Sequence, residues 1–334
     1  MTGLSAVASS TGADTAAFRV PDPDGRLAGV RLIPEIRVSG HDFTRGEAGW
    51  ALVIDRPAVN RMEYRLEFRY PDGGSETVLD PGNPRRAAGA FGEKSVLEFP
   101  EYQPPAWLTA PADPGFSYDF ERWLDYRLWA PSDAGDNEHL PLLVVHDGPE
   151  YDELASLIQF VGAGIAGHWL PRMRVALMHP GDRNRRYSAS VRYAGLLYHA
   201  LQELPSRPKI GMGTSLGALG MLHAHSRRPR LLDAMFLQSG SYFSPLLDAH
   251  ERRFPYFWRV ADFVAGAELT RPVPVALTCG TVEENLANNR AMTQRLRERG
   301  YPAALHEVPD AHNYTAWRDA FDPHLTRLIQ RVCR

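Results

Sequence analysis

Residues 209–220 read KIGMGTSLGALG, and this stretch decides the fold. A short apolar strand comes first, a sharp turn carries Ser215, and small residues typical of the start of a packed helix follow. Gly213 and Gly217 flank the serine in the pattern G-x-S-x-G, the nucleophile elbow. The turn needs both glycines because the serine backbone is strained and a Cβ two residues away would collide with the crossing helix. The pattern therefore predicts a serine nucleophile between a strand and a helix.

Strand and helix patterns alternate on both sides of this stretch. The predicted strands are 126–129, 141–145, 173–178, 209–213, 234–237, 274–278 and 303–308, and the predicted helices are 190–204, 216–227, 286–299 and 314–332. Alternation of this kind indicates an α/β fold, with a mostly parallel sheet and helices on both faces. In such sheets the functional side chains gather at the carboxyl ends of the strands.

The first third of the chain has a different pattern. Residues 1–18 are small and polar, and we expect them to form a disordered tail. Further on, short strand patterns separated by turn formers predict a small all-β sandwich over residues 19–113. A segment rich in proline and alanine, Glu101–Pro114, is expected to link it to an α/β domain over residues 114–334.

Composition excludes several classes of function. The chain has 334 residues, 44% of them hydrophobic, which suits two soluble domains. A net charge of −3 with nearly balanced acids and bases gives no general case for binding nucleic acid or an anionic membrane. No apolar run is long enough to span a bilayer, and the N-terminus lacks a secretory signal pattern. With only Cys279 and Cys333, no disulfide framework is expected, and a cytoplasmic location fits best.

His312 is the predicted base. A serine hydroxyl needs a base to take its proton, and in a chain with this elbow the acid and then the histidine follow the serine in sequence. His312 lies in the loop Pro309–Asn313, directly after the last predicted strand and at the sheet edge where Ser215 is expected. The other histidines after the serine, most of them inside predicted helices or strands, are His223, His225, His250, His306 and His324.

The acid is expected on the loop after the preceding strand, residues 279–285. A carboxylate there would hold the imidazole in the correct tautomer and stabilise its cation. We favour Glu283 over Glu284, and leave Asp310 or the absence of any acid as further options. A carboxylate at this position is also favoured by the dipole of the following helix alone.

Two backbone N–H groups are expected to receive the oxyanion. The first belongs to Leu216, at the entrance of the helix that follows the serine. The second is expected from the loop after the first central strand, residues 146–151, and either Asp147 or Gly148 supplies it. His146 precedes the serine and is expected to be a structural hydrogen-bonding group.

An arginine-rich loop, residues 181–187, follows another strand and borders the same edge. Its guanidinium groups are suited to an anionic or polyphenolic substrate, although a solvated basic loop explains them equally well. The candidate substrate contacts are Arg183, Arg185, Arg186, Tyr187 and Tyr151. The sequence lacks a P-loop lysine and a dinucleotide fingerprint, and the two histidines of helix 216–227 face different directions, so no cofactor or metal is predicted.

These motifs resemble those of a family of α/β-hydrolase esterases. The family includes enterochelin esterases and some feruloyl and xylan esterases, with mycolyltransferases as distant relatives. The motifs are, in the family's order, VHDGP (145–149), DRNRRY (182–187), GTSLG (213–217), CGTVE (279–283) and His312. The resemblance covers residues 116–334 and implies an α/β-hydrolase fold with Ser215 as nucleophile, His312 as base and Glu283 as acid.

The N-terminal part is similar to the domain that precedes the hydrolase in enterochelin-esterase-like proteins. The stretches LDPGNP (79–84) and SVLEFP (95–100) carry this similarity, which implies an immunoglobulin-like, early-set sandwich. The pairing predicts a serine esterase that hydrolyses a small-molecule carboxylic ester through an acyl-enzyme on Ser215, with a ferric siderophore (enterochelin-like) ester as the leading candidate. The alternatives are an acyltransferase, a carbohydrate or feruloyl esterase of the same fold, and a non-catalytic ligand-binding protein. The oligomeric state stays open, a dimer included.

Overall fold

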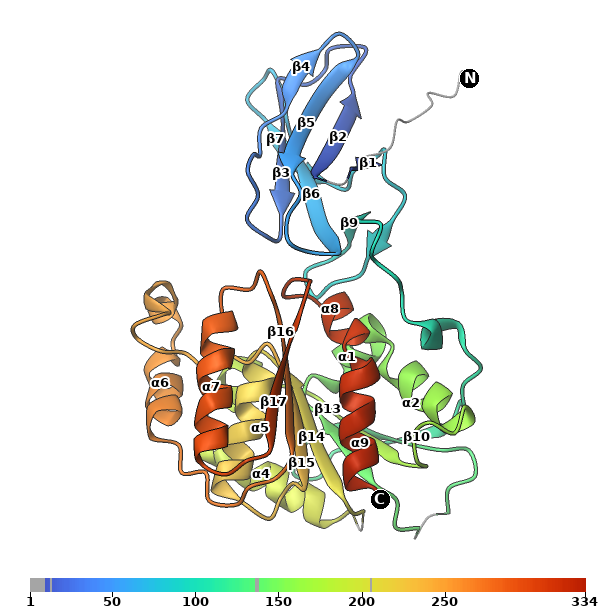
Figure 1. The fold of residues 1–334 in the computed structure, drawn as a ribbon, viewed down its shortest axis with the longest axis vertical. Coiled ribbons are helices and arrows are strands. Elements are labelled where there is room, and N and C mark those ends of the chain that lie inside the picture. The colour runs from blue at the N-terminus through green and yellow to red at the C-terminus, as the bar shows by residue number, and fades with distance from the viewer. Residues whose placement is uncertain (1–9, 13, 136–137, 205) are drawn as a thin grey trace. The chain divides into compact units, whose positions relative to one another are not determined.

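A computed structural model describes residues 10–12, 14–135, 138–204 and 206–334. The chain divides into two compact units (Figure 1). The N-terminal unit comprises Met1–Gln103 together with Pro309–Asn313, and the C-terminal unit comprises Pro104–Val308 and Tyr314–Arg334.

The described part of the N-terminal unit is built from strands. One sheet has the order β1-β2-β5-β4, and the other has the order β3-β6-β9-β8 with β7 also paired to β6. The strands are β1 (Ser10–Thr11), β2 (Thr15–Pro21), β3 (Gly29–Pro34), β4 (Thr44–Gly46), β5 (Gly49–Asp55), β6 (Arg61–Arg69), β7 (Ser75–Val78), β8 (Arg86–Ala87) and β9 (Lys94–Glu98). The sheets meet where Phe18 of β2 packs edge-on against Tyr64 of β6, with ring centroids 5.1 Å apart.

The N-terminal tail differs from the sequence prediction. Of the residues expected to be disordered, 1–9 and 13 lie outside the described part of the chain. Strands β1 and β2 occupy most of the remainder. The sequence of β2 suits a strand with one buried face, because Ala16, Phe18 and Val20 are buried while the residues between them are more exposed.

The C-terminal unit contains an eight-stranded mixed sheet of order β10-β11-β13-β12-β14-β15-β16-β17. Strands β10 and β11 pair antiparallel, as do β11 and β13, and every later pairing is parallel. The strands are β10 (Phe116–Phe120), β11 (Tyr126–Ala130), β12 (Leu142–Val145), β13 (Arg174–Met178), β14 (Lys209–Thr214), β15 (Ala234–Gln238), β16 (Val275–Gly280) and β17 (Ala303–Val308). The predicted α/β-hydrolase-like fold is thus confirmed for this unit.

Helices cover both faces of this sheet (Figure 1). They are α1 (Gly148–Ala155), α2 (Leu157–Ala166), α3 (Arg183–Tyr187), α4 (Val191–Gln202), α5 (Leu216–Arg227), α6 (Phe257–Gly266), α7 (Leu286–Glu298), α8 (Tyr314–Asp319) and α9 (Thr326–Val332). Leu142 and Val144 of β12 pack with α4, α5 and α7, whereas Leu143 and Val145 pack with α1, α2 and α9. Burial on both faces explains why the central strands are continuous apolar runs.

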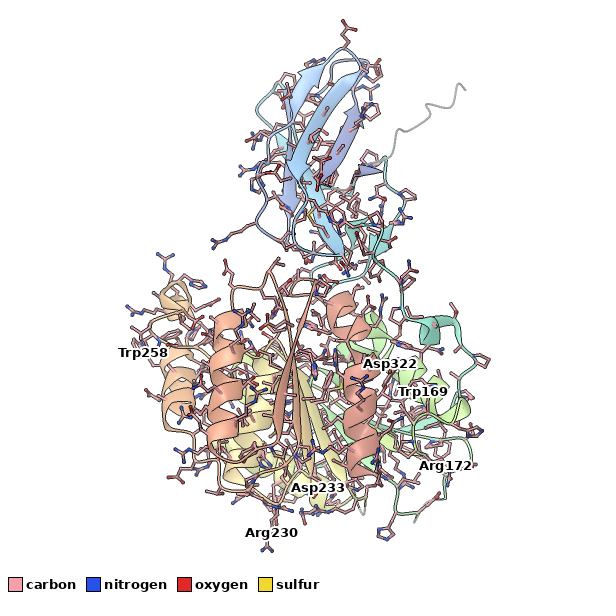
Figure 2. The ribbon with its side chains drawn as sticks, in the orientation of Figure 1. Trp169, Arg172, Arg230, Asp233, Trp258 and Asp322 are labelled. Atoms are coloured by element: carbon pink, nitrogen blue, oxygen red, sulfur yellow. The ribbon has the colours of Figure 1, made fainter. Side chains whose placement is uncertain are left out.

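Two predicted segments differ in detail. The predicted helix 314–332 is interrupted between α8 and α9, where Asp322 (labelled in Figure 2) has φ −103° and ψ 125°. Pro323 follows, and a residue before proline is sterically disfavoured in the helical region. The predicted linker Glu101–Pro114 contains a short 3₁₀ helix, η1 (Ala106–Thr109), whose buried Trp107 packs against Phe160. None of the described helices is both long and apolar enough to cross a membrane.

Candidate active site

Ser215 lies in a strained turn between β14 and α5. Its φ is 54° and its ψ is −122°, a conformation that L-residues rarely adopt and that costs on the order of 1–3 kcal/mol. A Cβ on Gly213 would lie 2.6 Å from the carbonyl carbon of Gly217, so the crossing helix excludes any side chain there. The Ser215 N–H donates to the Gln238 carbonyl at 2.9 Å, and the Ser215 carbonyl accepts from the Ser241 N–H at 3.1 Å. The elbow is therefore tied to the neighbouring strand β15 and the loop after it.

Ser241 is a residue that sequence reasoning missed. Its Oγ lies 3.0 Å from the Oγ of Ser215, within hydrogen-bonding distance. It belongs to the run Ser239-Gly240-Ser241, which directly follows buried strand β15. A cluster of small polar residues at the carboxyl end of a central strand is the signal that would have found it.

The first-turn N–H groups of two helices lie at the same edge of the sheet. Leu216 begins α5 and Gly148 begins α1, and these helices follow the adjacent parallel strands β14 and β12. The N–H of Asp147 is already used, because it donates to the Tyr187 hydroxyl at 3.2 Å. Among the residues that the structure describes, no hydrogen bond takes up the N–H of Leu216 or Gly148. Of the two alternatives for the second oxyanion donor, the geometry favours Gly148.

Gly148 also has no room for a side chain. A Cβ there would lie 2.3 Å from the Cα of Leu177, on the neighbouring strand β13. Only glycine allows the first turn of α1 to approach the sheet this closely.

His146 has the structural role expected for it. Its Nδ1–H donates to the Gly217 carbonyl at 2.8 Å, and its ring stacks on Tyr187 with centroids 4.3 Å apart. Complete burial lowers the pKa of the imidazole to about 4, so the ring stays neutral at physiological pH. His146 therefore holds the first turn of α5, which contains Leu216, through its hydrogen bond to Gly217.

The two candidate glutamates have different surroundings. An Oε1 of Glu283 accepts from the Ser239 hydroxyl and from the Gly280 N–H, both at 2.7 Å. The Ser239 hydroxyl in turn accepts from the Trp317 indole N–H at 2.9 Å. Glu284 is exposed, and its carboxylate lies 3.5 Å from Nε2 of His250. Glu283 is thus the carboxylate held at the carboxyl ends of β15 and β16.

His312 is exposed, and its segment connects β17 to α8. The other candidate histidines have contacts that occupy them elsewhere. His306 stacks on His324 with centroids 3.9 Å apart, His223 packs edge-on against Phe263, His225 bonds the Arg271 carbonyl, and His250 lies near Glu284. Chain order and exposure both keep His312 as the candidate base.

The arginine segment is a short helix rather than the expected loop. Asp182 caps α3, and Arg183 forms a forked ion pair with Asp147, with N–O distances of 2.8 and 2.9 Å. Arg186 donates from one terminal nitrogen to the carbonyls of His179 and Pro180. Arg185 is exposed, and its Nε lies 3.8 Å from Asp182 Oδ2.

Tyr187 and Tyr151, which were expected to contact the substrate, are both 0% exposed. The Tyr187 hydroxyl accepts from Asp147, and the Tyr151 hydroxyl donates to Gln238 at 2.9 Å. Each ring is part of the layer beneath the site, where an apolar body with a satisfied hydroxyl packs well.

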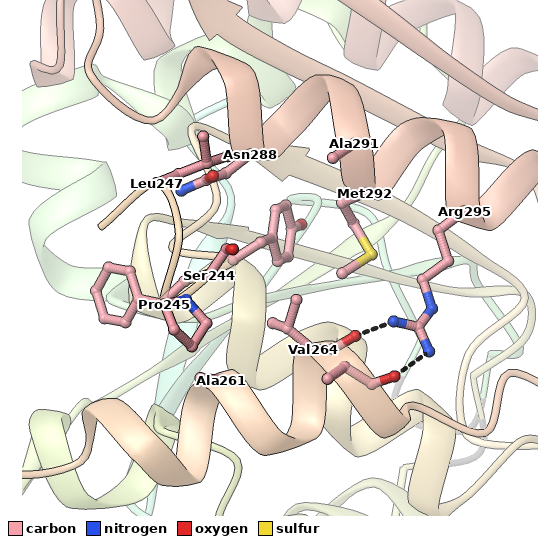
Figure 3. A pocket seen from close by; sticks show the side chains of 12 residues that line it. Ser244, Pro245, Leu247, Ala261, Val264, Asn288, Ala291, Met292 and Arg295 are labelled. Carbon is pink, nitrogen blue, oxygen red and sulfur yellow. Dashed lines mark hydrogen bonds between the residues drawn. The ribbon is translucent and has the colours of Figure 1, made fainter. Parts of the chain in front are cut away.

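The structure contains an apolar cavity of about 250 Å³ (Figure 3). Tyr242 and Phe243, which follow Ser241 in the chain, line it together with Met292 of α7 and Val264 of α6. Arg295 lies at one side and donates to the carbonyls of Val264 and Ala265.

A second, open hollow of about 610 Å³ lies beside Gly148, next to Pro149 and Glu150. Its lining carries four carboxylates, those of Asp119, Glu121, Asp125 and Glu150, and one guanidinium, that of Arg127. Arg127 is already paired with Asp119 at 2.9 Å. The hollow therefore offers no excess positive charge to an anionic ligand.

Comparisons with known proteins show which solved structures share this fold. No family model and no curated protein matches the chain. Among solved structures, an enterobactin esterase from Shigella flexneri in the presence of enterobactin has a TM-score of 0.75 at 18% identity, covering 96% of this chain and 95% of that one. A ferric enterobactin esterase from Salmonella typhimurium has a TM-score of 0.70 at 17% identity, covering 95% and 94%. A ferulic acid esterase has a TM-score of 0.50 at 14% identity, covering 65% of this chain and 96% of that one. The chain therefore shares, over nearly its whole length, the fold of the enterobactin esterases.

Proposed function

We propose that the protein is a serine esterase that hydrolyses a carboxylic ester through an acyl-enzyme on Ser215. The observation that carries this proposal is the strained elbow. It presents the Ser215 hydroxyl beside two helix N-termini whose Leu216 and Gly148 N–H groups have no partner among the described residues. Unused N–H groups at such a position are suited to a developing oxyanion.

In the proposed reaction, Ser215 Oγ attacks the ester carbonyl carbon while His312 accepts the hydroxyl proton. The carbonyl oxygen becomes an oxyanion, which the N–H groups of Leu216 and Gly148 receive. Collapse of this intermediate expels the alcohol with the proton from His312 and leaves the acyl group on Ser215. A water molecule then gives a proton to His312 and attacks the acyl carbon. The second collapse returns the proton to Ser215 and releases the carboxylic acid.

Glu283 is the proposed acid that orients and stabilises the His312 imidazole. Its fixed carboxylate supports this choice, since Ser239 and Gly280 hold one of its oxygens. The apolar cavity lined by Tyr242 and Phe243 is the proposed site for the acyl or alcohol part of the ester.

A ferric siderophore ester is the leading specific substrate, on the strength of the shared fold. The arginine segment supports it less than expected, because the Asp147 carboxylate already forms a forked ion pair with Arg183. Parallel measurement of kcat/KM for ferric enterobactin, a feruloyl ester and p-nitrophenyl butyrate ranks the substrates. Product analysis with an added alcohol acceptor separates hydrolysis from acyl transfer.

A fluorophosphonate probe tests the proposed nucleophile directly. We expect a single phosphonyl adduct on the peptide that contains Ser215, formed together with loss of p-nitrophenyl butyrate hydrolysis. Peptide mass spectrometry locates the adduct. A protein that only binds its ligand gives no adduct, and this outcome would favour the non-catalytic alternative.

Replacing Glu283 by glutamine is expected to lower kcat by about 10²–10⁴-fold, because an amide neither fixes the same tautomer nor stabilises the imidazolium. The matched control is Glu284→Gln, which neutralises the adjacent, exposed carboxylate and should keep kcat within about twofold. Steady-state kinetics on p-nitrophenyl butyrate measure both. The reverse ranking of the two variants would transfer the role to Glu284.

A further inference from the structure

The segment Pro309–Asn313, which carries His312, belongs to the N-terminal unit although it connects two elements of the C-terminal unit. Within the segment, the Ala311 N–H donates to Asp310 Oδ1 at 2.7 Å, the Asn313 N–H donates to the Ala311 carbonyl at 3.1 Å, and the Asn313 amide nitrogen lies 3.5 Å from Asp310 Oδ1. Residues outside the segment hold it as well.

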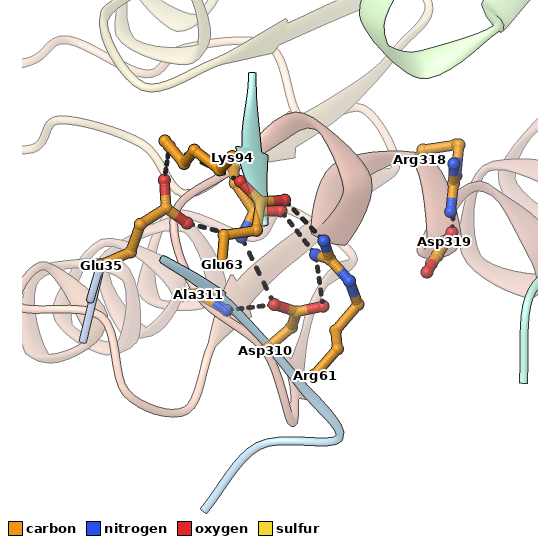
Figure 4. Close-up of polar contacts among 9 residues, drawn as sticks. Glu35, Arg61, Glu63, Lys94, Asp310, Ala311, Arg318 and Asp319 are labelled. Atoms are coloured by element: carbon orange, nitrogen blue, oxygen red, sulfur yellow. Dashed lines mark hydrogen bonds and ion pairs between the residues drawn. The ribbon is translucent and has the colours of Figure 1, made fainter. Parts of the chain in front are cut away.

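Arg61, the first residue of β6, supplies that support (Figure 4). One terminal nitrogen donates to Asn313 Oδ1 at 3.1 Å and lies 3.5 Å from Asp310 Oδ2. The other donates to Glu63 Oε1 at 2.6 Å. The guanidinium therefore contacts the residues on both sides of His312, two positions before it and one after it.

The surroundings hold Arg61 firmly in this arrangement. Its side chain is 1% exposed, and so is that of Glu63. Burial by itself lowers the pKa of the guanidinium, but the charges of Asp310 and Glu63 outweigh this and raise it. Arg61 thus stays charged, and its planar guanidinium fixes the geometry of its hydrogen bonds to the neighbouring residues.

Two further contacts fix the segment. The Asn60 N–H donates to the Pro309 carbonyl at 2.8 Å, and the Asn313 amide donates to Glu35 Oε2 at 3.1 Å. Lys94 pairs with Glu35 and also lies 3.5 Å from Glu63 Oε2 (Figure 4). Three residues of the segment, Pro309, Asp310 and Asn313, are thereby held from outside it, and the His312 side chain is exposed.

We propose that Arg61 is a positioning residue for the reaction, and that the N-terminal unit contributes to catalysis by fixing the segment that carries His312. This inference rests on the proposed function, because the residue that is positioned, His312, is the base of the proposed reaction. A displacement of about 1 Å of a catalytic group can cost about 100-fold in rate, so a base on a loosened segment would act far more slowly.

The test uses Arg61→Lys and Asn313→Ala in the full chain. Lysine keeps the charge but has no rigid fork, and alanine removes an acceptor of Arg61 while leaving its ion pairs. We expect each variant to lower kcat by about 10–100-fold with KM within about twofold. Hydrogen exchange of the Ala311 amide should become faster in both. Because both variants alter the contact between Arg61 and Asn313, their effects on kcat should not multiply in the double variant.

Two controls separate positioning from general damage to the unit. Arg65→Lys alters another arginine of β6, which donates to the carbonyls of Glu93 and Phe91. Tyr64→Phe removes a buried hydroxyl that donates to Asp80 at 2.6 Å. Both controls are expected to keep the wild-type kcat, whatever their melting temperatures.

The positioning role is overturned if folded Asn313→Ala and Arg61→Lys keep the wild-type kcat and Ala311 protection while Ser215→Ala and His312→Ala are inactive. Should Arg61→Lys not fold, Asn313→Ala decides by the same two measurements. If Ser215→Ala or His312→Ala retains full hydrolysis, the proposed function itself fails, so the two failures are distinguishable.

Discussion

Replacing Ser215 by alanine is expected to lower kcat for p-nitrophenyl butyrate by about 10⁵–10⁶-fold, because no acyl-enzyme can form without the hydroxyl. The residual rate would come from substrate binding and from the N–H groups of Leu216 and Gly148, which the substitution leaves in place. The fold is expected to survive, since alanine keeps the elbow backbone and removes only the Oγ contact with Ser241. Steady-state kinetics and circular dichroism of the purified variant measure the two effects.

Two other serines serve as a control and as an alternative nucleophile in this experiment. Ser226 lies on α5, and its hydroxyl donates to the His223 carbonyl at 2.8 Å. Ser226→Ala is therefore a matched control on the helix that follows the elbow, and it should keep the wild-type kcat. Ser241 is the alternative nucleophile to be tested, because its Oγ is 3.0 Å from that of Ser215. Retained hydrolysis in Ser215→Ala, with loss in Ser241→Ala, would make Ser241 the nucleophile.

The elbow was predictable because its determinants are local. Strand β14, the turn and helix α5 are encoded by the consecutive residues 209–227, and both glycines act within that span. The central strands were predictable for a related reason, since burial on both faces leaves continuous apolar runs.

Contacts between distant residues were not predictable. Arg183 is neutralised by Asp147, which lies 36 positions earlier in the chain, and no local pattern announces that pairing. Glu283 and Glu284 are adjacent in the chain, yet the first accepts from the Ser239 hydroxyl and the second lies near His250, and no local pattern predicts this difference. The contact between Arg61 and Asp310 spans 249 positions and depends wholly on how the N-terminal unit folds. Local sequence therefore identified the candidate nucleophile, and tertiary packing determines what supports it.

His312→Ala is expected to lower kcat by about 10⁵–10⁶-fold, close to the effect of removing the nucleophile, because serine and base act as one unit. The double variant Ser215→Ala/His312→Ala should then be hardly slower than either single variant. Added imidazole is expected to restore part of the lost rate in His312→Ala by entering the vacated position and accepting the Ser215 proton. It should restore nothing in Ser215→Ala. Initial rates with and without imidazole measure this difference.

His250→Ala is the control for this experiment. His250 is exposed and lies 3.5 Å from the carboxylate of Glu284, so these two residues form a histidine–glutamate pair. If Pro309–Asn313 carries the base, His250→Ala keeps its activity and gains nothing from imidazole. Loss of activity in His250→Ala, with retention in His312→Ala, would instead assign the base to His250 and the acid to Glu284. In that case the contacts from Arg61 to Asp310 and Asn313 would stabilise the fold without acting on the chemistry.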